Sequence, residues 1–345
     1  MDLMTVTGPV KHDCLGIILP HEHLFIDLRN QFSEFADEEK RRISQQPLCM
    51  RNLGAVRVNP YAIRDNLLLD DLDTAATEVE AFQSLGGRTI VDCTSVGIAR
   101  DARALRALAE RTGLNIVAGC GYYTYDTHPS DFDTWSLERI ADEMLRDVLE
   151  GIDDTGVRAG IYGEIGTSDP IRPNEIKALL ATARAFREHP LEVQVHTYPW
   201  GQAGREASRL LIDAGVDPGR IVICHTDIEF CMEYIVDLLK LGVNIEFDNF
   251  GKEFTIPKAD RGFAGGIFAR DIDRVRVLRE LLDQDFEAQL LVTNDICLKS
   301  LLRAYGGYGY DHILRQVVPL MKEFDISDNT IDALLRRNPA RILCG

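Results

Sequence analysis

The feature of this sequence that most constrains its fold is a repeated alternation of short apolar runs with longer amphipathic segments. Eight runs are short, rich in valine and isoleucine, and apolar almost throughout, which is typical of strands buried on both faces of a sheet. These predicted strands lie at residues 16–19, 88–92, 115–118, 159–162, 192–195, 221–224, 243–247 and 290–293.

Amphipathic segments lie between the runs, with apolar side chains at the three- and four-residue spacing of a helix. We predict helices at residues 71–85, 102–111, 137–150, 174–187, 203–214, 232–241 and 271–283, and two more at 310–324 and 327–337. A strand followed by a helix, repeated eight times, indicates a parallel sheet, and eight such units close a barrel.

The expected fold is therefore α/β, a single (β/α)8 TIM barrel with its site at the C-terminal ends of the strands. A doubly wound open sheet is the alternative, but the first strand lacks the usual glycine-rich turn and is followed by His21-Glu22-His23. We see no internal repeat and no flexible linker. We expect residues 1–345 to form one domain, with an insertion after the first strand at about 24–70.

The charge of the chain excludes several classes of partner. The formal net charge is −17 and the sequence pI is about 4.9, so the protein repels phosphate backbones and anionic membrane surfaces. We expect no nucleic acid and no membrane as partner, since no apolar run reaches the ~18 residues of a membrane span. The first twenty residues do not resemble a signal peptide. The eight cysteines are scattered, without C-x-x-C spacing, which favours free thiols in the cytoplasm.

Histidines and a carboxylate follow the first and fourth predicted strands. His21 and His23 are two residues apart, so along a strand they point to the same side and can bind one metal. The alternative is an ordinary pair of loop histidines. Glu164 follows the fourth strand between glycines, and a buried carboxylate there needs a positive partner. A solvated turn is the alternative for Glu164.

Three more residues of the same kinds end later strands. His196 ends the fifth strand and His225 ends the sixth. A single histidine on an apolar strand is more often a core residue, but two on adjacent strands at the same level favour a site. Asp295 follows the eighth strand and faces the same mouth, where it could bind a metal and take a proton from metal-bound water.

These six residues exceed the ligand set of a single catalytic ion with an open position. They fit two divalent ions, zinc first, with manganese, iron or cobalt as alternatives. Two ions about 3.5–4 Å apart, bridged by a carboxylate and a hydroxide, catalyse hydrolysis. The predicted metal ligands are His21, His23, Glu164, His196, His225 and Asp295.

The motifs around these residues resemble the phosphotriesterase family of the amidohydrolase superfamily over nearly the whole chain. The matching segments are Pro20-His21-Glu22-His23-Leu24, Ala159-Gly160-Ile161-Tyr162-Gly163-Glu164-Ile165-Gly166, Val195-His196-Thr197, Cys224-His225-Thr226-Asp227, Phe250-Gly251-Lys252, Asn294-Asp295 and Gly306-Gly307-Tyr308-Gly309-Tyr310.

The resemblance also implies a role for each ligand. His21, His23 and Asp295 would bind the more buried ion, and His196 and His225 the more exposed one. Glu164 would bridge the two ions. Asp295 would accept the proton from the bridging hydroxide, as general base and then general acid.

Two positions depart from the best-known members of this family. Those proteins bridge their metals with a carboxylated lysine where this chain has Glu164, and the nearest lysine is Lys177. A glutamate bridge resembles the branch called phosphotriesterase-related or resiniferatoxin-binding proteins, and implies assembly without bicarbonate. Asn294 replaces the histidine found before the aspartate in strong phosphotriesterases, which weakens the case for a phosphotriester substrate.

Candidate substrate-binding residues follow the third, seventh and eighth strands. Tyr122 or Tyr123 could orient a carbonyl, as a tyrosine on this loop does in the lactonases that the chain resembles, or could simply pack at the barrel mouth. Lys252, Lys299 and Arg303 could form a basic pocket for an anionic group, because barrels often bind phosphate near strands 7 and 8. A solvated helix face is the alternative.

Three functions are compatible with these residues. The first is hydrolysis of a carboxylic ester or lactone, including an anionic or phosphorylated sugar lactone, by attack of the metal-bridging hydroxide on the carbonyl. The second, implied by the resemblance because this branch of the family includes such enzymes, is an amidase acting on a small N-acyl amino or sulfonic acid; phosphotriesterase activity is a further alternative. The third is a binding protein without catalysis. The expected partner is a small-molecule substrate, and the resemblance adds a homodimer, since relatives are often dimers.

Overall fold

Eight parallel strands form the centre of the molecule. The structure, a computed structural model, describes residues 2–32, 34–262 and 265–345. The strands are β3 (Ile17–Glu22), β6 (Gly87–Asp92), β7 (Asn115–Cys120), β8 (Ile161–Gly166), β9 (Val193–His196), β10 (Ile221–Ile223), β11 (Asn244–Phe247) and β12 (Leu290–Val292). They pair in sequence order, and every pair is parallel. All eight predicted strands are confirmed.

The first and last strands of this sheet are joined through side chains. Thr293, just after β12, donates its hydroxyl hydrogen to the Glu22 carboxylate on β3, 2.6 Å away. The backbone N–H groups of Asn294 and Ile296 donate to the two oxygens of the same carboxylate, at 2.9 and 2.8 Å. Glu22 therefore fixes the chain that follows β12 against β3, and the predicted barrel is confirmed.

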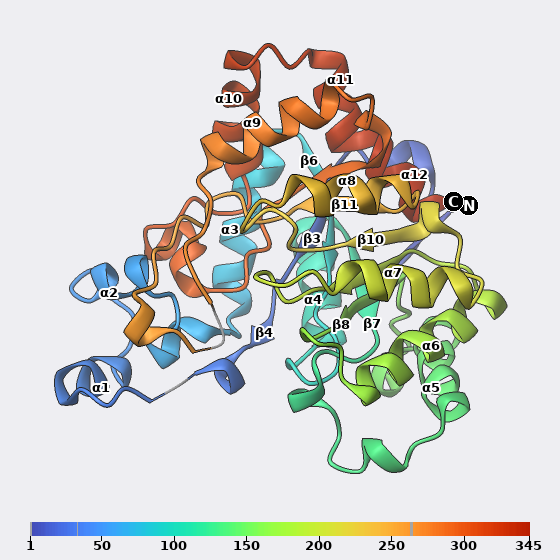
Figure 1. Cartoon of the computed structure of the whole chain (residues 1–345), viewed down its shortest axis with the longest axis horizontal. Helices are drawn as coiled ribbons and strands as arrows, with labels where there is room; N and C mark the ends of the chain where they lie inside the picture. Colours follow the sequence, from blue (N-terminus) through green and yellow to red (C-terminus); the bar gives the residue numbers. More distant parts are fainter. Residues whose placement is uncertain (1, 33, 263–264) are drawn as a thin grey trace.

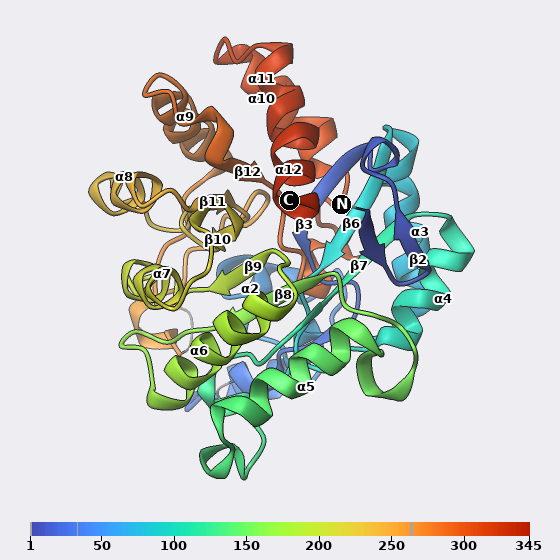
Figure 2. The ribbon, with the colours of Figure 1, turned by 90° about the vertical axis from the view of Figure 1, so that its right-hand side faces the viewer.

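Helices surround the strands (Figure 2). Seven of them connect successive barrel strands, namely α3 (Leu72–Ser84), α4 (Ala102–Thr112), α5 (Leu137–Leu149), α6 (Pro173–Glu188), α7 (Gly204–Asp213), α8 (Met232–Lys240) and α9 (Asp271–Leu282). Three of them begin at a side chain that accepts a hydrogen bond from the first turn, namely Asp71, Asp101 and Ser136. Helix α4 ends at Gly113, whose φ of 72° suits glycine. These helices lie where the apolar spacing predicted them.

The last helical segment of the chain runs on further than predicted. The first predicted segment forms a π-helical turn (Ile313–Val317) and α10 (Val318–Glu323). The second forms α11 (Asp328–Asp332) and a further π-helical turn (Ala333–Arg337), and then continues into α12 (Asn338–Cys344), which the prediction missed. Leu343 of α12 packs with Leu3, Ile18 and Val91, and this cluster covers the end of the barrel opposite the strand C-termini.

The chain between β3 and α3 covers the other end. It contains the short antiparallel pair β4 (Ile26–Asp27) and β5 (Leu68–Leu69), and two short helices, α1 (Glu38–Ser44) and α2 (Leu53–Val58). Helices α1 and α2 lie on the side of the molecule away from both chain termini (Figure 1). A salt bridge of 2.7 Å joins Lys40 of α1 to Asp260, in the loop that follows β11. These two segments therefore meet over the C-terminal ends of the strands.

Within the described residues, no helix has the length and apolar character needed to cross a bilayer.

Candidate metal centre

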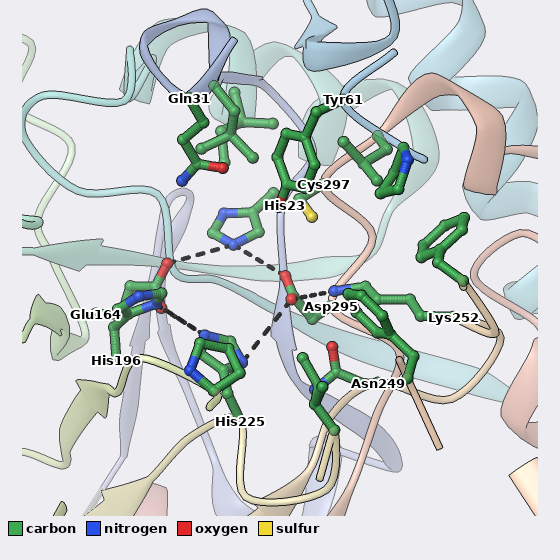
Figure 3. Close-up of a pocket in the computed structure, with 18 of the residues that line it drawn as sticks. His23, Gln31, Tyr61, Glu164, His196, His225, Asn249, Lys252, Asp295 and Cys297 are labelled. Carbon is green, nitrogen blue, oxygen red and sulfur yellow. Dashed lines mark hydrogen bonds and ion pairs between the residues drawn. The ribbon is translucent and has the colours of Figure 1, made fainter. Parts of the chain in front are cut away.

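Six buried side chains converge at the C-terminal ends of the barrel strands. They come from five strands or the residues directly after them, and each of these residues is at most 6% exposed. Figure 3 shows five of them around a common centre. The six are His21, His23, Glu164, His196, His225 and Asp295, the same residues that their positions at the strand ends had predicted.

One half of the cluster contains residues from the first and last strands of the barrel or from the loops that follow them. His23 Nε2 lies 3.2 Å from Asp295 Oδ1 and 3.5 Å from Glu164 Oε1. His21 Nε2 lies 3.7 Å from Glu164 Oε2 and 3.9 Å from Asp295 Oδ1. These nitrogens and oxygens are therefore close enough to share one ion.

The other half is built on the fifth and sixth strands. His196 Nδ1 lies 2.8 Å from His225 Nε2 and 3.2 Å from Glu164 Oε2. His225 Nε2 lies 3.5 Å from the same carboxylate oxygen. Glu164 thus has Oε1 towards His23 and Oε2 towards His196 and His225, so its carboxylate lies between the two halves of the cluster.

The unpaired atoms of this cluster fit a metal site. His21 Nε2 and Asp295 Oδ1 are buried and have no hydrogen-bond partner among the described residues. A buried polar atom left without a partner costs free energy, so such atoms are rare in native proteins. Within 4.8 Å of one another lie ligand atoms of His21, His23 and Asp295, and likewise those of His21, Glu164 and His225. Imidazole and carboxylate are the donor set of a divalent transition metal.

Outer carboxylates and a hydroxyl orient the histidines. His21 Nδ1 lies 3.0 Å from Glu246 Oε2, and His23 Nδ1 lies 2.9 Å from Thr94 Oγ1. His225 Nδ1 lies 3.2 Å from Asp248 Oδ2, which also accepts the His225 backbone N–H. Occupying one ring nitrogen in this way leaves the other directed at the cluster, as in metal-binding histidines generally.

Sequence reasoning missed Glu246 and Asp248. The predicted strand at 243–247 counts as apolar almost throughout, although Glu246 and Asp248 alternate at its end. Residues two apart on a strand point to the same side, and both carboxylates are fully buried. Two alternating acids in a buried strand are the pattern that could have identified them.

The electrostatic field of the cluster favours positive charge. Burial lowers the pKa of His21, but the hydrogen bond to Glu246 and the charge of Glu164 outweigh it and raise the pKa to about 10. The Asp248 carboxylate likewise raises the pKa of His225 against the effect of burial. Burial raises the pKa of Glu164, yet His196 and its neighbours hold that pKa well below the usual range. Burial lowers the pKa of His196, so the field of the buried carboxylates favours positive charge at His21 and His225 but not at every position of the cluster.

Two of the six side chains stand on left-handed backbone. The φ angles are 61° at His225 and 47° at Asp295, a region that costs a non-glycine residue about 1–3 kcal/mol. The His225 backbone is held by Asp248, and the residues on either side of Asp295 are held by Glu22. The surrounding hydrogen bonds thus fix a conformation that turns both side chains into the cluster.

A pocket opens at the cluster. One wall is apolar and includes Ile228, Phe254 and Phe268. Five of the six cluster residues line the pocket, all but His21. The other polar residues that line it include Gln31, Tyr61, Tyr123, Asn249, Lys252 and Cys297. Gln31, Tyr61, Asn249 and Cys297 were not identified from the sequence, because they come from loops that converge only in the folded chain.

The two tyrosines after β7 face different surroundings. The Tyr123 hydroxyl lies 3.3 Å from His196 Nδ1, and Tyr123 lines the pocket. Tyr122 instead packs on Phe132 and Trp135, with ring centroids 4.8 and 6.0 Å away, and it is not among the described residues that line the pocket. Tyr123 is therefore the tyrosine that the structure brings to the cluster.

Of the three predicted cationic residues, one is among the described residues that line the pocket. Lys252 is 4% exposed, lines the pocket and forms a salt bridge with Asp295. Lys299 instead pairs with Asp65 at 2.6 Å, and Arg303 pairs with Asp311 at 3.2 Å. Neither Lys299 nor Arg303 is among the described pocket-lining residues. The structure therefore does not form the expected three-residue basic pocket.

A parallel eight-stranded barrel with this cluster at its mouth has the architecture of a metal-dependent hydrolase. A model of the phosphotriesterase family matches residues 1–343. An N-acetyltaurine hydrolase from Xenopus tropicalis is 34% identical over 343 residues, which cover 99% of this chain and 97% of that protein.

Two solved structures extend the comparison. A resiniferatoxin-binding protein from Rhodobacter sphaeroides has a TM-score of 0.95 at 32% identity, over 99% of this chain and 94% of that one. A mutant of a PTE-like lactonase from Deinococcus radiodurans has a TM-score of 0.77 at 27% identity, over 99% of each chain. The chain belongs to the phosphotriesterase family and is a metal-dependent hydrolase of small molecules.

Proposed function

We propose that this protein hydrolyses the amide bond of a small anionic N-acyl amino or sulfonic acid at a binuclear metal centre. The observation that carries the proposal is the position of Lys252, the only lysine or arginine among the described pocket-lining residues, directly beside the ligand cluster. A buried cation there suits an anionic substrate in a protein whose net charge is otherwise −17.

The amide is favoured over the ester or lactone by the relatives of the chain. Proteins named N-acetyltaurine hydrolase match it at 34% identity over almost their whole length, whereas the similar PTE-like lactonase is 27% identical. This reverses the order of the two hypotheses drawn from the sequence. A lactonase is the second candidate, since one barrel site can cleave either carbonyl.

The proposed ligand assignment follows the two halves of the cluster. His21, His23 and Asp295 would hold one ion, His196 and His225 the other, and Glu164 both. Divalent ions bound there would lower the pKa of water and polarise the substrate carbonyl. Zinc is the first expectation for both.

The chain's own residues would bind the substrate and move the proton. Asp295 Oδ1 faces His23, whereas Oδ2 is held by Lys252. Burial raises the pKa of Asp295, but Lys252 and His23 outweigh it and keep the carboxylate ionised. Asp295 would accept a proton from the attacking water and deliver it to the leaving nitrogen. The C–N bond breaks, a C–O bond forms, and the products are a carboxylic acid and an amine.

Two further residues would orient the substrate. The Lys252 ammonium group has three N–H donors, so its bond to Asp295 leaves others for a sulfonate or carboxylate. Burial raises the pKa of Tyr123 well above its usual value, which keeps the phenol protonated as a donor to a carbonyl oxygen. The apolar wall would hold the acyl group.

The test begins with protein purified without chelators. We expect close to two equivalents of transition metal per chain, and turnover of N-acetyltaurine or another anionic N-acyl amino acid above that of lactones and esters. Chelation should abolish turnover and added zinc, manganese or cobalt should restore it. Preferential turnover of lactones would favour the second candidate, and a metal-loaded protein inert to every amide, ester and lactone would favour a binding protein.

A further inference from the structure

The carboxamide of Asn249 has a fixed orientation at the wall of the pocket. Asn249 follows β11, is 1% exposed, and lies on the same side of the pocket as His225 and Asp295 (Figure 3). Its Nδ2 donates to Asp227 Oδ1 at 2.7 Å and also to Asp248 Oδ1. Its backbone N–H donates to the other oxygen of Asp227 at 3.0 Å.

The two acceptors determine which amide atom faces the pocket. An ionised carboxylate only accepts hydrogen bonds, so the side-chain nitrogen must point to Asp227 and Asp248. Both carboxylates are themselves held, Asp227 by Arg274 Nε at 3.0 Å and Asp248 by the backbone and ring of His225. A flip of the amide would place an oxygen against two carboxylates. Oδ1 is therefore the atom that the carboxamide presents to the pocket.

This oxygen accepts no hydrogen bond from the residues that the structure describes, and Asn249 lines the pocket. A site that places an acceptor against a bound ligand discriminates strongly against ligands that offer no donor. A secondary amide has an N–H beside its carbonyl. An ester or lactone has an oxygen at that position, which would face Oδ1 as a second acceptor.

We infer that Asn249 Oδ1 accepts a hydrogen bond from the N–H of the scissile amide, and that Asn249 thereby selects amides over esters. The inference rests on the proposed function and names the group that makes it specific. The same hydrogen bond would hold the nitrogen on the side of the pocket where Asp295 must protonate it. Asn249 is thus a specificity-determining residue for the reaction.

The experiment compares three substrates that differ only at the position of the amide nitrogen: N-acetyltaurine, its ester analogue with oxygen in place of N–H, and its N-methyl amide. We measure kcat/KM for each with the wild-type protein and with Asn249→Ala and Asn249→Ser, after confirming equal metal content. Loss of this hydrogen bond should lower the amide-to-ester ratio roughly 10- to 100-fold in both variants. The ratio of kcat/KM for the parent amide to kcat/KM for the N-methyl amide should fall by a similar factor. Asn329→Ala, an exposed change on α11, is the matched control.

The outcomes separate this inference from the proposed function. General damage to the site would lower kcat/KM for the amide and the ester together and leave the amide-to-ester ratio unchanged. That result would overturn the role of Asn249 but not the amidase proposal. If the wild-type protein cleaves the N-methyl amide at the rate of the parent amide, that result alone would overturn the role of Asn249, without any variant. A wild-type protein that cleaves the ester but not the amide would overturn both.

Discussion

His21 Nδ1 lies 3.0 Å from Glu246 Oε2, and both side chains are fully buried inside the barrel. The contact fixes the ring so that Nε2, the atom without a partner, faces the cluster. A carboxylate behind a metal-binding histidine also makes the imidazole a stronger ligand. Glu246 is therefore expected to contribute to metal affinity without touching the ion.

Glu246→Gln should weaken binding of one of the two ions by roughly 10- to 100-fold, because the neutral amide no longer polarises His21. The measurement is metal content after dialysis against graded chelator. Glu192→Gln is the matched control, because Glu192 is buried, accepts a hydrogen bond from Gln194 and, among the described residues, forms no hydrogen bond or ion pair with the six cluster residues. Equal metal loss in both variants would contradict the role of Glu246.

Glu164→Ala should prevent assembly of a two-ion centre, because this carboxylate directs one oxygen at His23 and the other at His196 and His225. Elemental analysis should find at most about one ion per chain, against about two in the wild-type protein. Two tightly retained ions in the variant would show that Glu164 is not the bridge. The wild-type protein should also load metal equally well in bicarbonate-free buffer.

Asp295→Asn should lower kcat roughly 10²- to 10⁴-fold, because an amide cannot accept and return a proton. Much of the metal should stay bound, since the asparagine oxygen can still face His23. Turnover and metal content measured on one preparation test both statements. A wild-type rate in the metal-loaded variant would exclude Asp295 as the proton carrier.

Lys252→Met should raise KM for an anionic amide roughly ten- to a hundredfold, the usual value of a charged hydrogen bond. Uncharged amides should be affected much less. Lys299→Met is the informative comparison, since Lys299 pairs with Asp65 instead of lining the pocket. A similar rise in KM for both variants would contradict the assignment of the anion site to Lys252.

Glu192 should make the metal-free protein less stable as pH rises. Burial raises its pKa from 4.5 to about 8 in the folded chain, so folding takes up a proton between these values. The contribution of this carboxyl group to the free energy of unfolding is complete below pH 4.5. It decreases as the pH rises towards about 8, by about 1.4 kcal/mol per pH unit. Denaturant unfolding of wild type and Glu192→Gln across this window should show a flatter profile for the variant. Parallel profiles would contradict the shifted pKa.

The strands and most helices could be predicted because their patterns are local. A strand buried on both faces is apolar along its length, and residues 221–224 show this without reference to any other segment. The extension into α12 could not be predicted in this way. Its apolar residues pack against Leu3 and Ile18, which are distant in the sequence.

The candidate site likewise contains residues that could be predicted from the sequence and residues that could not. Barrel geometry brings all strand ends to one mouth, so His196 and His225 could be selected by position alone. The outer groups could not, because Lys252 and Lys299 both follow late strands and differ only in which acid each side chain meets. Asn249 offered no signal at all, since its orientation depends on two carboxylates fixed elsewhere.

The meeting of His23 with Asp295 has a consequence for biosynthesis. His23 is synthesised long before Asp295, and their side chains lie 3.2 Å apart only after the last strand of the barrel has joined the first. A chain in which Asp295 has not yet been synthesised cannot present this pair, and neither can a fragment cut before Asp295. Capture of the ion that these two residues would share therefore requires a closed barrel, so that an ion bound there marks a molecule whose first and last strands have met.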